Sequence, residues 1–132
     1  MRVLFVDDDA MNRRVVRDML VVAGVSVDEA HDGPTGLGMV DQGDYALVLM
    51  DLRMPGMDGL EAIQCLRSRG DTKGDLPIIV LTADTSADIR ERCRSCGADD
   101  FLMKPVAMKP LFRAMAKAIA VRSQGHRPAG AL

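Results

Sequence analysis

The chain has 132 residues, of which 48% are hydrophobic and 27% charged, and these proportions predict one soluble globular domain. A net charge of −2 and an aromatic content of 3% argue against direct binding of nucleic acid. Three cysteines are too few for a disulfide framework, and no signal peptide or apolar run of ~20 residues is present, so we expect a cytoplasmic protein without membrane insertion.

The first 24 residues show one strand pattern and one helix pattern. The run RVLFV predicts a buried strand at 2–6. Apolar residues then recur every four positions over 10–23, which is typical of one helix face, and Asp9 is expected to cap that helix before Gly24 ends it. The stripe comprises Met11, Val15, Met19 and Ala23, with Val16 and Leu20 beside them.

The same alternation continues to the end of the chain. We expect strands at 25–30, 46–50, 77–82 and 100–103, and helices at 34–40, 60–66, 89–96 and 108–119, with a polar loop at 67–75. Five strand and helix pairs with continuous apolar strands predict an α/β fold, in which helices cover both faces of a parallel sheet. We assign residues 1–121 to one domain and expect 122–132 to be a disordered tail.

Polar residues follow four of the five predicted strands. Asp7 and Asp8 follow the first, Asp51 follows the third, Thr82 ends the fourth and Lys104 follows the fifth. In an open parallel sheet these carboxyl ends meet at the edge where ligands bind, so the side chains should converge there.

Clustered carboxylates repel one another, and this predicts a bound cation. Oxygen ligands without a histidine or cysteine cluster favour a hard ion, and we expect Mg²⁺, with Mn²⁺ as an alternative. A metal, a hydroxyl and a lysine would suit an incoming phosphoryl group, and Asp51 is then a candidate nucleophile that would form an aspartyl phosphate.

Four segments carry a resemblance to a known family. VLFVDDD, LVLMDLRMPGMDG, PIIVLTA and GADDFLMKP, in this order and spacing, resemble the receiver domains of bacterial two-component response regulators over residues 2–121. The resemblance implies a flavodoxin-like, doubly wound (βα)5 fold with strand order 2-1-3-4-5. The corresponding lysine–proline peptide bond is often cis in such domains, so the resemblance implies a cis bond between Lys104 and Pro105.

The resemblance assigns roles to individual residues. It implies that Asp51 is the phosphoacceptor and that Asp7, Asp8 and Asp51 bind the metal together with the main-chain carbonyl of Arg53. Thr82 is similar to the family's switch hydroxyl. Two further roles are implied: Lys104 as the phosphoryl-binding lysine, and Phe101 as the switch aromatic.

The implied function is a phosphorelay switch rather than an enzyme. A histidine kinase or a histidine phosphotransfer protein would phosphorylate Asp51, and the fourth helix, fifth strand and fifth helix would then bind a downstream protein. Met1 and the tail favour a stand-alone regulator, whereas Asn12-Arg13 resembles receivers of hybrid kinases.

The resemblance implies that two positions flank the phosphoryl group, and here they are Arg53 and Asp84. They have opposite charges, and we expect them to approach one another across the mouth of the site and slow the hydrolysis of the aspartyl phosphate.

Two other functions use similar residues. A phosphohydrolase with an aspartyl nucleophile would need a second acid two residues after Asp51, where this chain has Arg53. A flavodoxin-like nucleotide binder would need a phosphate loop after the first strand, where this chain has aspartates. Cys93 and Cys96 resemble a redox pair, but they lie near a helix C-terminus on its apolar face, which favours a packing role.

Overall fold

A computed structural model describes residues 1–84 and 86–123 of the chain. Five parallel strands form one sheet in the order β2-β1-β3-β4-β5, as expected for a flavodoxin-like fold. The strands are β1 (Arg2–Val6), β2 (Ser26–Ala30), β3 (Leu47–Asp51), β4 (Ile78–Thr82) and β5 (Asp100–Met103). The helices are α1 (Ala10–Val22), α2 (Gly33–Gln42), α3 (Gly59–Arg67), α4 (Ala87–Cys96) and α5 (Met108–Ser123).

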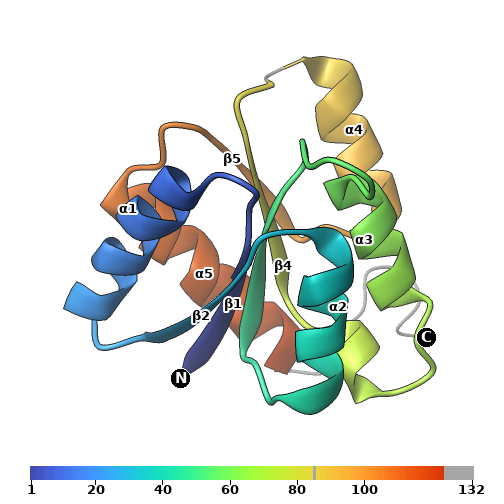
Figure 1. Ribbon diagram of the computed structural model, residues 1–132, viewed down its shortest axis with the longest axis horizontal. Coiled ribbons are helices and arrows are strands. Elements are labelled where there is room, and N and C mark those ends of the chain that lie inside the picture. Colours follow the sequence, from blue (N-terminus) through green and yellow to red (C-terminus); the bar gives the residue numbers. More distant parts are fainter. Residues whose placement is uncertain (85, 124–132) are drawn as a thin grey trace.

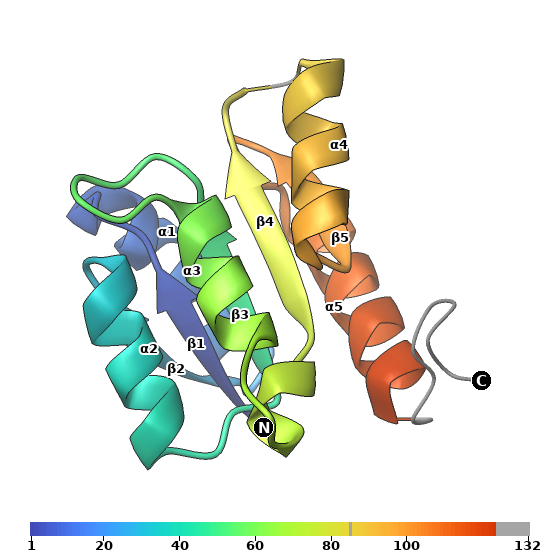
Figure 2. The same ribbon diagram turned by 90° about the vertical axis from the view of Figure 1, so that its right-hand side faces the viewer.

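Helices cover both faces of the sheet. Figures 1 and 2 show α1 and α5 on one face, and α2, α3 and α4 on the other. Side chains alternate along each strand, so Val3 and Phe5 of β1 enter the core under α1 and α5, while Leu4 and Val6 enter the opposite core. This two-sided burial explains why the central strands are continuously apolar.

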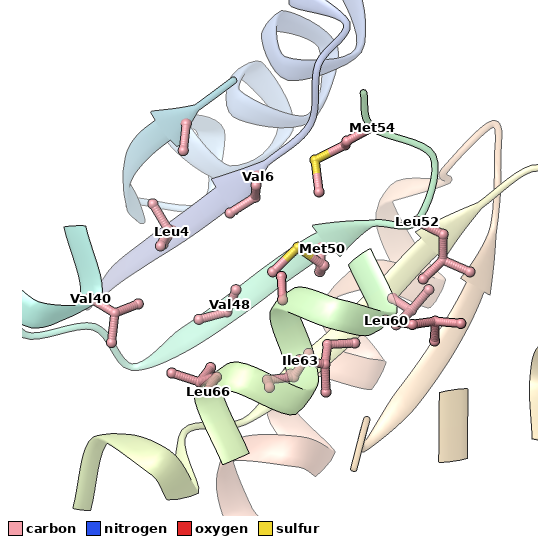
Figure 3. Packing of buried hydrophobic residues seen from close by; sticks show 14 of the residues in the cluster. Leu4, Val6, Val40, Val48, Met50, Leu52, Met54, Leu60, Ile63 and Leu66 are labelled. Atoms are coloured by element: carbon pink, nitrogen blue, oxygen red, sulfur yellow. The ribbon is translucent and has the colours of Figure 1, made fainter. Parts of the chain in front are cut away.

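The core under α2 and α3 supports the end of β3. In Figure 3, Val48 and Met50 of β3 lie between side chains of β1 and those of α3, including Ile63 and Leu66. Every residue of β3 and β4 is buried. The last residue of each of these two strands is therefore held by a rigid, packed element.

Only part of the predicted apolar stripe of the first helix faces the core. Met11 is 68% exposed and Val15 is 46% exposed, whereas Val16 and Leu20 are buried against the sheet. A spacing of four residues drifts by about 40° per step around a helix, so the sequence offers two overlapping apolar stripes. The packing of α1 against the sheet buries the side of the stripe that carries Val16 and Leu20.

Several predicted element ends also shift. Asp9 caps α1 as predicted, and Asp58 caps α3. The predicted loop at 67–75 instead contains the last residue of α3 and a short 3₁₀ helix, η1 (Thr72–Asp75). The predicted tail begins too early, because α5 continues to Ser123; the rest of that tail, 124–132, lies outside the described residues. Among the described helices, none is long and apolar enough to cross a bilayer.

Candidate functional site

The functional side chains converge at the carboxyl edge of the sheet. Register places Val6 of β1 beside Met50, Asp51 beside Leu81, and Thr82 beside Met103. Asp7 and Lys104 each follow directly after the strand that precedes them, so parallel pairing brings residues from four strands to one place. This agrees with the convergence predicted from the sequence.

Three carboxylates form the centre of the site. Ligand oxygens of Asp7, Asp8 and Asp51 all lie within 4.8 Å of one another. Asp7 is fully buried and Asp51 is 5% exposed, whereas Asp8 is exposed at the rim. The Asp7 carboxylate accepts a hydrogen bond of 2.9 Å from the backbone N–H of Asp9, which fixes its orientation. All three donors are oxygens, which is the ligand set of a hard divalent cation.

Lys104 links two of these acids. Its Nζ lies 3.1 Å from Asp7 Oδ2 and 3.1 Å from Asp51 Oδ1. Burial and the charge of Asp7 raise the pKa of Asp51, while Lys104 and a backbone hydrogen bond from Arg53 act in the opposite direction. Burial disfavours the Lys104 ammonium, but the two carboxylates outweigh this effect and raise the pKa of Lys104. The lysine therefore stays charged beside the nucleophile candidate.

Thr82 and Phe101 occupy different surroundings. Thr82 is buried, and its Oγ1 accepts a hydrogen bond of 3.1 Å from the backbone N–H of Asp84, which leaves its own proton free to donate. Phe101 pairs with Val80, two residues before Thr82, and packs half-buried against the core under α4. The guanidinium of Arg90 lies 5.3 Å from its ring centroid, within the range of a cation–π contact.

Arg53 and Asp84 approach one another at the mouth of the site. Arg53 Nη2 lies 3.5 Å from Asp84 Oδ2, and the two side chains are 80% and 25% exposed. The pKa of Asp84 is lowered chiefly by hydrogen bonds from Ser86, with Arg53 adding to the effect. Both side chains line a groove of about 500 Å³ that begins at Asp8 and continues to Arg92 of α4.

Gly59 lies against the end of β3 and was missed by the sequence reasoning. Its N–H donates to the carbonyl oxygen of Leu52 at 2.9 Å. A Cβ atom at this position would lie 2.3 Å from the carbonyl oxygen of Asp51 and 2.8 Å from the Cα of Leu52. Only glycine permits α3 to begin so close to the backbone of Asp51. The Asp-Gly pair at the start of α3 is the sequence signal that could have revealed this contact.

Two further predictions concern the cysteines and the peptide bond before Pro105. Cys93 is buried and Cys96 packs against the same core, so their predicted packing role is confirmed. All three cysteines are free thiols. The peptide bond between Lys104 and Pro105 is cis.

The chain is similar in sequence and in fold to known proteins. The sequence model for the response regulator receiver domain matches residues 3–116. Response regulator MprA of Mycobacterium avium is 44% identical over 115 residues, which are 87% of this chain and 49% of that protein. Its counterpart in Mycobacterium tuberculosis is 43% identical over 114 residues. The chain therefore spans about half the length of the curated relatives that it matches.

Two solved structures show the same architecture. Chemotaxis protein CheY4 of Vibrio cholerae superposes with a TM-score of 0.82 at 29% identity, covering 89% of this chain and 97% of that one. The receiver domain of sensor histidine kinase PA1611 of Pseudomonas aeruginosa has a TM-score of 0.82 at 32% identity, with 90% and 97% coverage. That structure is described as having a magnesium ion coordinated in its active site cleft. The family match, the relatives and the shared fold show that this chain belongs to the response regulator receiver domain family of two-component signalling.

Proposed function

We propose that this receiver is a phosphorelay switch in which Asp51 is the phosphoacceptor. The observation that carries the proposal is the position of Asp51, whose carboxylate ends a buried strand 3.1 Å from Lys104 Nζ and within 4.8 Å of two further acids. A carboxylate oxygen would attack phosphorus in a phosphohistidine. An O–P bond then forms, the P–N bond breaks, and the imidazole nitrogen keeps the electron pair.

The acids at this edge fit a hard divalent cation. Asp7, Asp8, Asp51 and the main-chain carbonyl of Arg53 would hold Mg²⁺, and Mn²⁺ would suit the same oxygen donors. When bound, such a cation would neutralise negative charge on the phosphoryl oxygens. Three carboxylates face one ammonium here, so the site retains the excess negative charge that a cation would offset.

Lys104 and Thr82 are proposed to recognise the transferred group. Lys104 already lies beside the Asp51 oxygen, so its ammonium is placed to pair with a phosphoryl oxygen after transfer. Thr82 has a free hydroxyl proton, and it would donate this proton to another phosphoryl oxygen once it released the N–H of Asp84.

The movement of Thr82 is proposed to carry the signal outward. Phe101 would fill the space that Thr82 vacates, and its contact with Arg90 would couple this change to the surface of α4. A downstream protein would then read the face formed by α4, β5 and α5. The event is a shift between two states that is biased by local charge.

The donor is proposed to be a histidine kinase or a histidine phosphotransfer protein. A receiver of this size is compatible both with a stand-alone regulator and with one part of a longer chain, as in the relatives that are twice as long. The phosphohydrolase alternative is disfavoured because Arg53, not an acid, lies two residues after Asp51 and points to the exposed mouth of the site.

The experiment compares phosphate uptake by wild type and Asp51→Asn. Both proteins are incubated with Mg²⁺ and acetyl phosphate, or with a phosphorylated histidine phosphotransfer domain, and weighed as intact proteins. Wild type should gain one phosphoryl group and Asp51→Asn none. Asp9→Asn is the matched control, because it alters a neighbouring acid yet keeps a good N-cap for α1. Equal uptake by wild type and Asp51→Asn would refute the assignment.

A further inference from the structure

Arg13 connects the acid site to the edge of the sheet. It lies in the second turn of α1, and its side chain is only 17% exposed. Its Nη1 donates to the carbonyl oxygen of Asp7 at 2.6 Å, and its Nε donates to Glu29 Oε1 on β2 at 3.2 Å. The other carboxylate oxygen of Glu29 accepts from Arg17 at 2.9 Å. Glu29 therefore holds the guanidinium against the backbone of a metal-site residue.

The backbone that Arg13 holds determines where Asp8 lies. The N–H of Asp7 continues the pairing of β1 with β2 by donating to Ala30, but beyond this point the chain leaves the sheet. The carbonyl of Asp7 belongs to the peptide group that leads directly into Asp8. Within residues 1–84 and 86–123, no side-chain hydrogen bond fixes the exposed Asp8 carboxylate. Its placement beside Asp51 therefore depends on the orientation of the peptide that Arg13 binds.

We infer that Arg13 is a positioning residue for the divalent cation, acting by orienting the Asp7–Asp8 peptide. This inference rests on the proposed function of the acid site. Glu29 supports this role because its negative charge offsets the positive charge of the Arg13 guanidinium. Arg13 can therefore orient the acids with little repulsion of an incoming cation. Residues that hydrogen-bond to metal ligands, without touching the metal themselves, commonly orient those ligands and increase the affinity for the metal.

Removing the Arg13 side chain should weaken Mg²⁺ binding, which is the opposite of what simple electrostatics predicts. Removing a positive charge beside three carboxylates would, by Coulomb attraction alone, strengthen the binding of Mg²⁺. Loss of orientation would weaken it. We expect Arg13→Ala to bind Mg²⁺ about tenfold more weakly than wild type. Arg14→Ala is the matched control. Arg14 is exposed and has no contact with Asp7 or Glu29, so its substitution removes the same charge from the same turn without affecting either residue.

The measurement is calorimetric titration of each variant with Mg²⁺, after thermal melting has verified that it is folded. Asp8→Ala provides the reference for loss of a direct ligand. Arg13→Lys keeps the charge and one donor but loses the forked geometry, so its affinity should lie between wild type and Arg13→Ala. It is the deciding variant if Arg13→Ala does not fold. Arg14→Ala should bind like wild type.

The phosphorylation rate at low and at saturating Mg²⁺ distinguishes a positioning role of Arg13 from a general disruption of the structure. If Arg13 acts through the cation, the phosphorylation rate of Arg13→Ala should return close to that of wild type at saturating Mg²⁺, and the deficit should appear only at low Mg²⁺. A folded Arg13 variant that binds Mg²⁺ as tightly as wild type, or a deficit that saturating Mg²⁺ leaves unchanged, would overturn the inference. Failure of wild type to bind Mg²⁺ or accept phosphate would instead refute the proposed function.

Discussion

Replacing Gly59 with alanine should destabilise the protein even though alanine favours helices. Gly59 is the first residue of α3, and its backbone rests on the end of the acceptor strand. The added Cβ would meet the carbonyl oxygen of Asp51 at 2.3 Å and the Cα of Leu52 at 2.8 Å. Both are backbone atoms, so relief requires α3 to move away from β3 or the Asp51 peptide to rotate. Either shift displaces the acceptor.

The size of the effect follows from two opposing contributions. Forcing an extra methyl group into a packed contact costs about 1–3 kcal/mol. Alanine offers up to about 1 kcal/mol over glycine inside a helix, and this gain is smaller at a first helical position. We therefore expect the free energy of unfolding to fall by about 2 kcal/mol in Gly59→Ala. Displacement of Asp51 should also slow phosphorylation by about tenfold or more.

Gly38→Ala is the matched control. Gly38 lies in the interior of α2, is exposed, and has no atom within 4 Å of the position that a Cβ would take. There the helix preference acts alone, and stability should rise by about 1 kcal/mol with phosphorylation unchanged. Urea unfolding gives the free energies, and acetyl phosphate uptake gives the rates. If Gly59→Ala were as stable as Gly38→Ala, the close approach of α3 to the acceptor strand would be wrong.

Two further predictions concern the mouth of the site and the switch. Arg53→Glu should speed the loss of phosphate from Asp51, because the ion pair of Arg53 with Asp84 at 3.5 Å is expected to hinder the attacking water. Adding Asp84→Arg should restore part of the lifetime of the aspartyl phosphate. Additive rates in this double-mutant cycle would show that the two residues act independently. Beryllofluoride, a phosphoryl mimic, should shift NMR signals across residues 82–111 as well as around Asp51. Shifts limited to the acid site would contradict signalling through Phe101.

The sequence alone was sufficient to predict the succession of elements and the polar edge of the sheet. Continuous apolar runs, cap residues and helical spacing are local signals, so strands and helices could be placed to within a few residues. Once the strands were taken as parallel, the convergence of Asp7, Asp51, Thr82 and Lys104 followed from the rule that their carboxyl ends meet at one edge. The chemistry of these residues indicated a cation site, a phosphoryl group and a nucleophilic Asp51, whereas the switch roles of Thr82 and Phe101 came from the resemblance to a family.

Only the tertiary structure decided which contacts those local patterns make. Two apolar stripes compete along α1, and packing on β1 buries Val16 while leaving Val15 at the surface. The bridge from Lys104 to two acids, the contact of Arg13 with the Asp7 carbonyl and the approach of Gly59 to Asp51 join residues that are distant in sequence or reach back around a turn. Such contacts depend on how whole elements pack in three dimensions, where differences of a few tenths of an ångström matter, and no local spacing of residue types encodes them.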